Sequence, residues 1–193
     1  MAVEREIEAL AVRFGQPRRV VSAIDDYFDD PIRKDDRFGE VCMVIRRPSG
    51  TLLLSIKTFY PRGAFRLPTG GIHHGEAVYD ALVREAYEET GLDLGVERFL
   101  AHIAYPSTRV GSSPPLFHTF AFLLNERGGT LGAIDKTEQI GGWREITPGE
   151  LPAVADFLGN LRTSGTMDIG GDWAAWGRFR AVVHRVVHET LSG

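Results

Sequence analysis

The segment TGGIHHGEAVYDALVREAYEETGL, residues 69–92, combines a glycine pair, two adjacent histidines and four glutamates. Pro68 and the glycine pair interrupt the β-rich pattern before them, and the residues from Glu76 to Thr90 have helical periodicity. Gly91 follows directly, as glycine commonly does at the C-terminus of a helix. The segment therefore predicts a glycine-containing loop followed by a helix.

One face of the expected helix changes from apolar to acidic along its length. The stripe, at spacings of four, three and four residues, consists of Val78, Leu82, Glu85 and Glu89, with Glu88 beside it. Because unpaired carboxylates are costly inside a packed core, the acidic half must face a cleft that continues the core. Each pair of like charges on an exposed helix costs about 0.2–0.5 kcal/mol, and a divalent cation would remove this repulsion. The stripe therefore predicts a cation site.

The same segment resembles the Nudix box, G-x5-E-x7-R-E-U-x-E-E-x-G-U, in which U is a bulky aliphatic residue. The positions of the box are occupied in register by Gly70, Glu76, Arg84, Glu85, Ala86, Glu88, Glu89, Gly91 and Leu92. Only Ala86 is smaller than the pattern prefers. The resemblance extends over residues 39–160 and implies an α+β fold, a Nudix-type α/β/α sandwich with a mixed β-sheet. It also implies cleavage of a nucleoside diphosphate linked to another moiety.

The resemblance carries roles for individual residues of the box. It implies that a metal ion is bound by three glutamates and a loop carbonyl, namely Glu85, Glu88, Glu89 and Gly70. Arg84 and Glu76 match the pair that orients the loop and helix; we group Arg84 with the catalytic residues, and Glu76 and Gly91 with the structural ones. Since hard oxygen ligands suit Mg²⁺ or Mn²⁺, the expected cofactor is Mg²⁺, with Mn²⁺ as the alternative.

The expected reaction is attack by a metal-activated water on one phosphorus of a pyrophosphate, and a carboxylate must take the proton of that water. Within the box, Glu88 or Glu89 could do so. In several family members a glutamate in a later loop serves instead, and the motif EQIGGW places Glu138 five residues before Trp143. Glu138 is therefore a candidate base or additional ligand, with a solvated loop carboxylate as the alternative.

The adjacent histidines, His73 and His74, are not expected to bind a metal. Zinc sites use other spacings, and neighbouring side chains on a loop rarely reach one ion together. We expect a solvated pair on a turn, with contact between His74 and a substrate phosphate or ribose as the alternative. Thr69 replaces a glycine that is common just before the box, which leaves the shape of the loop open.

Substrate recognition depends on residues outside the box. Tyr105 and Pro106 follow it at a distance that resembles the downstream proline of ADP-ribose pyrophosphatases. Candidate side chains for stacking on a base or pairing with a phosphate are Phe59, Tyr60, Arg62, Phe65 and Arg109, although for each one taken singly the pattern favours ordinary surface or core. The favoured substrate is ADP-ribose or a similar sugar nucleotide; dinucleoside polyphosphates and nucleoside triphosphates are alternatives.

Two other functions are compatible with a Nudix-type fold. A regulator that senses a nucleotide without hydrolysing it would be expected to have a damaged box and a basic DNA-binding domain, whereas the box glutamates are intact and the C-terminal RFRAVVHRVVHE is too short for a winged helix. An isoprenoid isomerase would need a catalytic cysteine, and the single cysteine, Cys42, lies in an apolar run that predicts a buried strand.

The composition favours one soluble domain. The chain has 193 residues, of which 43% are hydrophobic, and a formal net charge of −4, so no overall basic field favours nucleic acid as a partner. Neither a signal peptide nor a run of about 18 apolar residues is visible, and the lone cysteine fits a reducing compartment. We expect a cytoplasmic protein with a small nucleotide as its partner and no membrane association.

The chain divides into three expected parts. Residues 1–38 form a short amphipathic helix and an irregular, solvated connection over residues 18–38; residues 39–160 form the Nudix domain; residues 161–193 form a helical extension that packs on it. Within the domain we expect a hairpin around Pro48–Gly50, a short strand at Ala64–Leu67 and later strands in RFLAHIAY, LFHTFAFLL and QIGGWREI. The helices are expected over Pro148–Leu161 and Trp173–Leu191. The aromatic stripe of the last helix is expected to form core or a dimer face, so a homodimer stays open.

Overall fold

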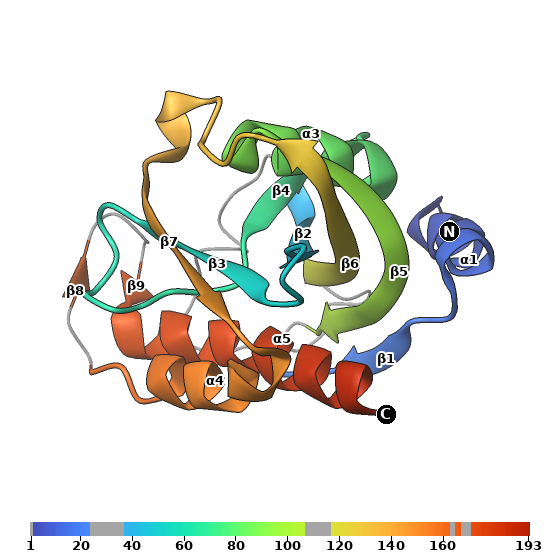
Figure 1. Cartoon of the computed structure of the whole chain (residues 1–193). Coiled ribbons are helices and arrows are strands. Elements are labelled where there is room, and N and C mark those ends of the chain that lie inside the picture. The colour runs from blue at the N-terminus through green and yellow to red at the C-terminus, as the bar shows by residue number, and fades with distance from the viewer. Residues whose placement is uncertain (1, 24–36, 107–116, 163–164, 167–170) are drawn as a thin grey trace.

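A mixed β-sheet with helices against both faces makes up most of the computed structural model, which describes residues 2–23, 37–106, 117–162, 165–166 and 171–193 (Figure 1). The helices are α1 (Ala2–Phe14), α3 (Val78–Thr90), α4 (Leu151–Gly159) and α5 (Trp173–Ser192), with 3-10 helices η1 (Lys136–Glu138) and η2 (Pro148–Glu150). The strands of the main sheet are β1 (Arg18–Val21), β2 (Arg37–Arg46), β3 (Leu52–Lys57), β4 (Thr69–His73), β5 (Leu92–Tyr105), β6 (Phe117–Gly129) and β7 (Ile140–Ile146). Strands β8 (Gly165–Thr166) and β9 (Gly171–Asp172) form a separate pair.

The strand order of the main sheet is β1-β5-β6-β2-β3-β7, and β4 pairs with β2 beside this path. The pairs β1–β5 and β2–β6 are parallel, whereas β2–β3, β2–β4, β3–β7 and β5–β6 are antiparallel. The expected hairpin is confirmed, because β2 and β3 pair across the turn and the Arg47 amide donates to the Thr51 carbonyl at 2.9 Å. The mixed sheet confirms the predicted α+β class.

Alternating side chains of the central strands pack into two separate hydrophobic cores, one on each face of the sheet. In β2, Val41, Met43 and Ile45 pack in the core beside α1 and α3, whereas Cys42 and Val44 pack in the core beside α4 and α5. A strand buried on both faces appears in the sequence as a continuous apolar run, which is how VCMVI appears. The sheet is therefore the middle layer of three, as predicted, with α3 on one face and α4 and α5 on the other (Figure 1).

The aromatic stripe of α5 belongs to the second of these cores. Its buried members are Trp173, Trp176, Phe179, Val183 and Val187, all packed in the core with α4 and the sheet. The expectation that these side chains form core is confirmed.

Helix α1 packs more closely than its place at the start of the chain indicates. Ile7 and Leu10 are buried in the core beside α3, and the carboxylate of Glu6 accepts a hydrogen bond from the Val78 amide at 2.5 Å. The first amides of a helix have no partner within the helix, so Glu6 supplies one to α3. Helix α1 thus supports the start of the helix that carries the acidic stripe.

Two local predictions were wrong. The irregular connection expected over residues 18–38 contains strand β1, whose residues pair with Ala101–Ala104 of β5, and the beginning of β2 at Arg37. Strand β1 lies at an edge and three of its four side chains are exposed, so it has no apolar alternation to detect. The short strand expected at Ala64–Leu67 is a single bridge between Ser55 and Arg66. Within the described residues, no helix is long and apolar enough to cross a membrane.

Candidate active site

Helix α3 buries the stripe that the sequence predicts. Val78 and Leu82 are fully buried, and Glu85 and Glu89 are only 6% and 1% exposed. The helix ends at Gly91, which adopts the left-handed conformation at φ 64° and donates its amide to the Tyr87 carbonyl. The predicted C-terminal glycine is therefore confirmed, and two carboxylates lie buried in the second half of the helix.

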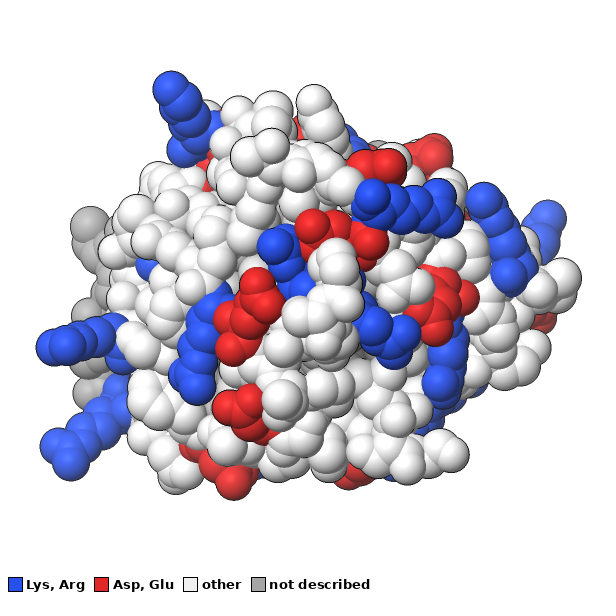
Figure 2. Space-filling view, in the orientation of Figure 1, with Lys and Arg blue, Asp and Glu red and all other residues white. Residues whose placement is uncertain are grey.

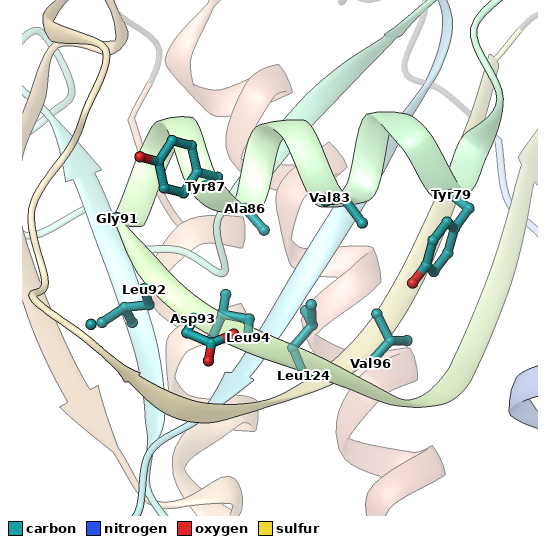
Figure 3. Close-up of a pocket in the computed structure, with 11 residues that line it drawn as sticks. Tyr79, Val83, Ala86, Tyr87, Gly91, Leu92, Asp93, Leu94, Val96 and Leu124 are labelled. Carbon is teal, nitrogen blue, oxygen red and sulfur yellow. The ribbon is translucent and has the colours of Figure 1, made fainter.

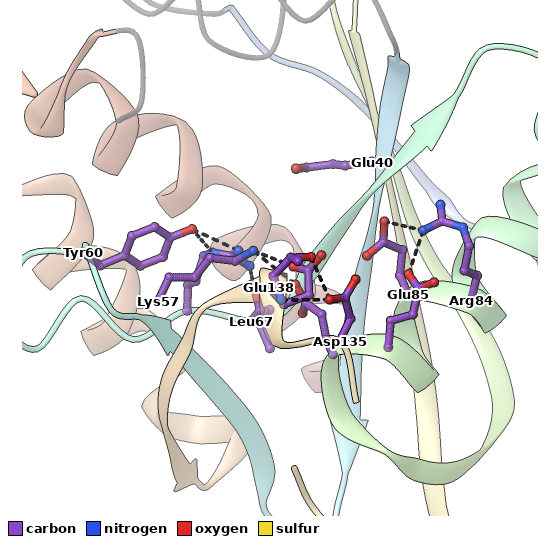
Figure 4. A network of polar contacts seen from close by, with 12 residues as sticks. Glu40, Lys57, Tyr60, Leu67, Arg84, Glu85, Asp135 and Glu138 are labelled. Carbon is purple, nitrogen blue, oxygen red and sulfur yellow. Dashed lines mark hydrogen bonds and ion pairs between the residues drawn. The ribbon is translucent and has the colours of Figure 1, made fainter. Parts of the chain in front are cut away.

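Arg84 connects the acidic half of α3 to the preceding loop. Its guanidinium donates to both oxygens of Glu76, at 2.8 and 2.9 Å, and to the Gly71 carbonyl at 3.0 Å. The same side chain donates to Glu85 at 2.9 Å and Glu88 at 3.1 Å (Figure 4). These hydrogen bonds raise the pKa of Arg84, and the bond with Arg84 lowers the pKa of Glu76. Arg84 and Glu76 are thus paired, and their role in orienting the loop and helix stays a prediction.

Gly70 leaves room for the carboxylate of Glu85. A Cβ atom on Gly70 would lie 2.1 Å from Cδ of Glu85, which no side chain permits. The neighbouring Thr69 begins β4 and pairs with Cys42 of β2, so the loop shape that its presence left open is that of a regular strand. Burial raises the pKa of Glu85, and the hydrogen bond with Arg84 opposes this shift.

In the part of the chain that the structure describes, the buried carboxylate of Glu89 lacks the hydrogen bonds that usually accompany a buried charge. Among the described residues, neither of its oxygens has a hydrogen-bond partner, and the nearest cation, the Lys57 ammonium, is 3.7 Å from Oε1. Burial raises the pKa of Glu89 to about 7, against the opposing charges of Arg66 and Lys57. A buried carboxylate without hydrogen bonds costs several kcal/mol, so a bound cation would relieve it.

The later glutamate, Glu138, lies at the same site. It belongs to η1, whose start is capped by the Asp135 side chain, which accepts from the Thr137 amide at 2.8 Å. The amide of Ile134 donates to the Glu88 carbonyl at 2.9 Å, which fastens this segment to the end of α3. Glu138 accepts from the Lys57 ammonium at 2.7 Å (Figure 4). The same ammonium is 3.7 Å from Glu89, so one lysine lies between the two carboxylates.

The carboxylate oxygens of the site are ligands that suit a hard divalent cation, but they do not converge on one point in this structure. Within the described part of the chain, no three His, Cys, Asp or Glu side chains are arranged to enclose an ion. Arg84 contacts Glu85 and Glu88, and Lys57 contacts Glu138, so positive side chains neutralise these carboxylates. The oxygens of Glu89, which have no hydrogen-bond partner among the described residues, and the close approach of the Glu85 carboxylate to the backbone of Gly70 are the features that fit a cation.

Two cationic residues at the site were not predicted. The first is Lys57, the last residue of β3. The second is the buried Arg66, which donates to the Tyr60 hydroxyl and to the Leu67 carbonyl. The motif FRLP, with an arginine among apolar residues, was a usable signal for Arg66. A lysine at the end of an apolar strand is common, so the sequence held no comparable signal for Lys57.

The substrate candidates lie in varied surroundings. Arg62 is exposed, Phe65 packs partly against the core beside α4 and α5, and the ring of Tyr60 packs against Trp176 with centroids 4.8 Å apart. Arg109 lies outside the described residues. Arg62, Phe65 and Arg109 remain predictions as substrate contacts.

His73, the last residue of β4, and His74, in the turn that follows, are both exposed, so the pair is solvated as expected but only His74 lies on the turn. The His73 amide donates to Glu76, and the His74 ring lies 6.3 Å from the ring of Phe38. Contact between His74 and a substrate remains a prediction.

A separate apolar pocket lies on the other side of α3. Its volume is about 420 Å³, and its lining, mostly apolar, includes Tyr79, Val83, Tyr87, Leu94, Val96 and Leu124 (Figure 3). None of the stripe's glutamates lines this pocket, and Glu85 lies in the polar network of Figure 4. On the molecular face of Figure 2, acidic and basic side chains lie directly beside one another.

Comparison with known proteins identifies the class of this domain. A family model described as NUDIX domain matches residues 36–163, more than half of the chain. The chain therefore belongs to the NUDIX domain family.

Two curated relatives show sequence similarity over part of their lengths. Nudix hydrolase 2 of Arabidopsis thaliana is 36% identical over 73 residues, which cover 37% of this chain and 26% of the relative. ADP-ribose pyrophosphatase of Methanocaldococcus jannaschii is 34% identical over 98 residues, which cover 50% of this chain and 55% of the relative. The matches thus span about a quarter and about half of the lengths of these relatives.

Solved structures show a more distant likeness. A UDP-X diphosphatase matches with 19% sequence identity and a TM-score of 0.44 over 58% of this chain and 52% of that chain. The E. coli ORF135 protein matches with 20% identity and the same TM-score over 61% of this chain and 79% of that chain. Likeness of this degree does not indicate what the chain acts on.

Proposed function

We propose that this protein hydrolyses the pyrophosphate bond of a nucleoside diphosphate linked to another moiety, in a reaction that depends on Mg²⁺. ADP-ribose or a similar sugar nucleotide is the favoured substrate. The sequence similarity to an ADP-ribose pyrophosphatase and the position of Pro106 after the box support this choice.

The observation that carries the proposal is the environment of Glu89. Its carboxylate is 1% exposed, has no hydrogen-bond partner among the described residues, and lies in one stripe with Glu85 on α3. Stability alone would favour a neutral or a paired side chain at this position, because an unpaired buried charge is costly. A function that needs a negative charge there, such as binding a divalent cation, explains why it is present.

The residues divide the work of the reaction as follows. Glu85, Glu88 and Glu89 would hold the cation, with the Gly70 carbonyl as a further ligand. Such a cation supplies Lewis-acid polarisation of the pyrophosphate oxygens and of the attacking water. Glu138, fastened beside α3 through the Ile134 amide, takes the proton from that water. Arg84 acts as a positioning residue, because it fixes two carboxylates of the stripe relative to Glu76 and the loop.

Two alternatives differ from this proposal in what they predict. Hydrolysis of dinucleoside polyphosphates or nucleoside triphosphates would use the same carboxylates with a different nucleotide. A regulator that binds a nucleotide without hydrolysis would not need the carboxylate of Glu89. The intact set of box glutamates favours hydrolysis.

The test is a panel of nucleotides incubated with the full chain and Mg²⁺. The panel contains ADP-ribose, a UDP-sugar, a dinucleoside polyphosphate and the nucleoside triphosphates, and release of a nucleoside monophosphate, inorganic phosphate or pyrophosphate is measured. We expect the fastest release from ADP-ribose or the sugar nucleotide, and none after addition of EDTA. No release from any member of the panel would support the non-hydrolysing regulator instead.

A further inference from the structure

Lys57 lies between two carboxylates that come from different parts of the chain. Its ammonium is 2.7 Å from Glu138 of η1 and 3.7 Å from Glu89 of α3. The side chains of Lys57, Glu138 and Glu89 are 17%, 23% and 1% exposed, so little water screens the three charges. The ammonium therefore occupies the side of the acidic stripe that faces η1.

The backbone of Lys57 is held by β7, whereas its long side chain ends in a hydrogen bond to Glu138. Lys57 pairs with Ile140 of β7, and the amide of the next residue, Thr58, donates to the Gln139 carbonyl at 2.9 Å. These two contacts fix the distance between β3 and the segment that carries Glu138. The four-carbon stem of lysine can still place its ammonium in more than one position.

The charges at this position are not balanced by the lysine alone. Among the described residues, the ammonium is within hydrogen-bonding distance of Glu138 only, and neither oxygen of Glu89 has a hydrogen-bond partner. The charge of Arg66 also acts on Glu89, but the ammonium of Lys57 is shared between two carboxylates and is hydrogen-bonded to only one of them. A divalent cation can contact both sides at once and carries twice the charge.

We infer that Lys57 is an exchangeable counter-ion: its ammonium neutralises Glu138 and Glu89 while no divalent cation is bound, and turns to a phosphate group of the substrate when one is bound. Two positive charges a few ångströms apart repel strongly where water is scarce, so a cation at Glu89 drives the ammonium away. The released ammonium is a compact positive charge, which suits a phosphate oxygen. Only this second part, the contact with phosphate, rests on the proposed function.

The first part is tested with Mn²⁺ alone, titrated into the full chain and followed by calorimetry, with no substrate present. Lys57→Met removes the competing charge and keeps most of the side chain volume, so we expect it to bind Mn²⁺ at least about fivefold more tightly than the wild-type chain. Lys57→Arg keeps the charge, and Lys136→Met removes an exposed charge two residues before Glu138. Both controls should bind Mn²⁺ with nearly wild-type affinity.

Equal or weaker Mn²⁺ binding by Lys57→Met would overturn the counter-ion role. A similar gain for Lys136→Met would overturn it as well, since the gain would then come from net charge and not from the position of Lys57. Thermal melting of each variant shows that the chains compared are folded. If Lys57→Met unfolds, Lys57→Gln, which also removes the charge, is measured in its place with the same expected gain and the same overturning result.

The second part is tested with methylene diphosphonate, a pyrophosphate analogue without a cleavable bridge, at saturating Mn²⁺. We expect Lys57→Met to bind the analogue about tenfold more weakly than the wild-type chain, and Lys136→Met to bind it equally well. Unchanged affinity for Lys57→Met would overturn the contact with phosphate. If the Mn²⁺ result holds while no nucleotide of the panel is hydrolysed, the proposed function fails and the counter-ion role stands.

Discussion

Two buried carboxylates, Glu40 and Glu89, differ in how their charges are satisfied. Glu40 of β2 is 5% exposed and accepts from one Arg180 nitrogen at 2.8 and 2.7 Å and from the Thr119 hydroxyl at 2.9 Å. Glu89 of α3 is 1% exposed, has no hydrogen-bond partner among the described residues, and lies 3.7 Å from Lys57. The first carboxylate joins β2 to α5, and the second has capacity left for a ligand.

The difference separates a charge that is satisfied within the fold from one that is not. Removing one member of a satisfied buried pair leaves its partner without compensation and costs about 3–5 kcal/mol. Removing a buried carboxylate that has no hydrogen-bond partner relieves a desolvation cost that the folded chain carries. The same substitution, Glu to Gln, should therefore lower the free energy of unfolding at position 40 and raise it at position 89.

The largest effect is expected on turnover from Glu89→Gln. Loss of the charge that would hold the cation should lower turnover at least about a hundredfold, because a catalytic cation contributes several kcal/mol to stabilising the transition state. Release of nucleoside monophosphate at saturating Mg²⁺ is the measurement, with Glu97→Gln, an exposed carboxylate of β5, as the control. Retained activity at saturating Mg²⁺ would count directly against the assigned site.

Glu40→Gln should have the largest effect on stability. We expect a loss of about 3 kcal/mol in the free energy of unfolding, since Arg180 would keep its buried charge without a carboxylate. Urea unfolding followed by circular dichroism measures the loss. Glu97→Gln breaks an exposed ion pair with Arg46 and should change the same quantity by less than about 1 kcal/mol. Equal stability of both variants would remove the distinction drawn between Glu40 and Glu89.

Glu138→Gln tests whether a carboxylate with a cationic partner also takes part in the reaction. If Glu138 accepts the proton of the attacking water, turnover should fall about a hundredfold while the chain stays folded. Asp156→Asn, which changes an exposed carboxylate of α4, serves as the control. Full turnover of Glu138→Gln at saturating metal would exclude this role.

The pH dependence of stability should isolate the buried charge of Glu89. Its folded pKa of about 7 lies above the ordinary value of 4.5, so its contribution to stability is present below about pH 4.5 and is lost as the pH rises through about 7. Glu89→Gln should therefore be more stable relative to the wild-type chain at pH 8 than at pH 5. The difference in the free energy of unfolding between the two proteins should change by about 2 kcal/mol between these pH values.

This comparison needs EDTA and two proteins at both values of pH. Burial lowers the pKa of His102 and of His184 to about 4. Each histidine therefore lowers the stability of the folded chain as the pH falls below the ordinary histidine value of 6.5. Both histidines are present in both proteins, and their effect cancels in the difference. A difference that does not change between pH 5 and pH 8 would show that Glu89 is not a costly buried charge.

His74→Ala should have the smallest effect. The side chain is exposed, so turnover and KM for the best substrate of the panel should stay within about twofold of the wild-type values. His73→Ala is the matched variant, because it removes the neighbouring exposed ring and leaves the amide that donates to Glu76. A tenfold rise in KM for His74→Ala alone would establish the alternative role of His74 in substrate contact.

Each part of the fold that the sequence predicted correctly depends on a pattern within a short stretch of the chain. The alternation in β2, the stripe from Val78 to Glu89 and the end of α3 at Gly91 each follow from the geometry of one strand or one helix. Strand β1 was missed because an exposed edge strand needs no apolar alternation. The placement of Glu138 required a spacing known from the family and not a local period.

The sequence by itself determined which side chains share a face of α3, because helical geometry places residues three and four apart side by side. Only the tertiary structure decided which charges meet across the chain. Glu6 supplies a partner for the Val78 amide, Lys57 meets Glu138 across 81 positions, and Arg180 meets Glu40 across 140. Such contacts depend on how strands and helices pack, and no local period records them; for that reason the acidic stripe was predicted and its counter-ion was not.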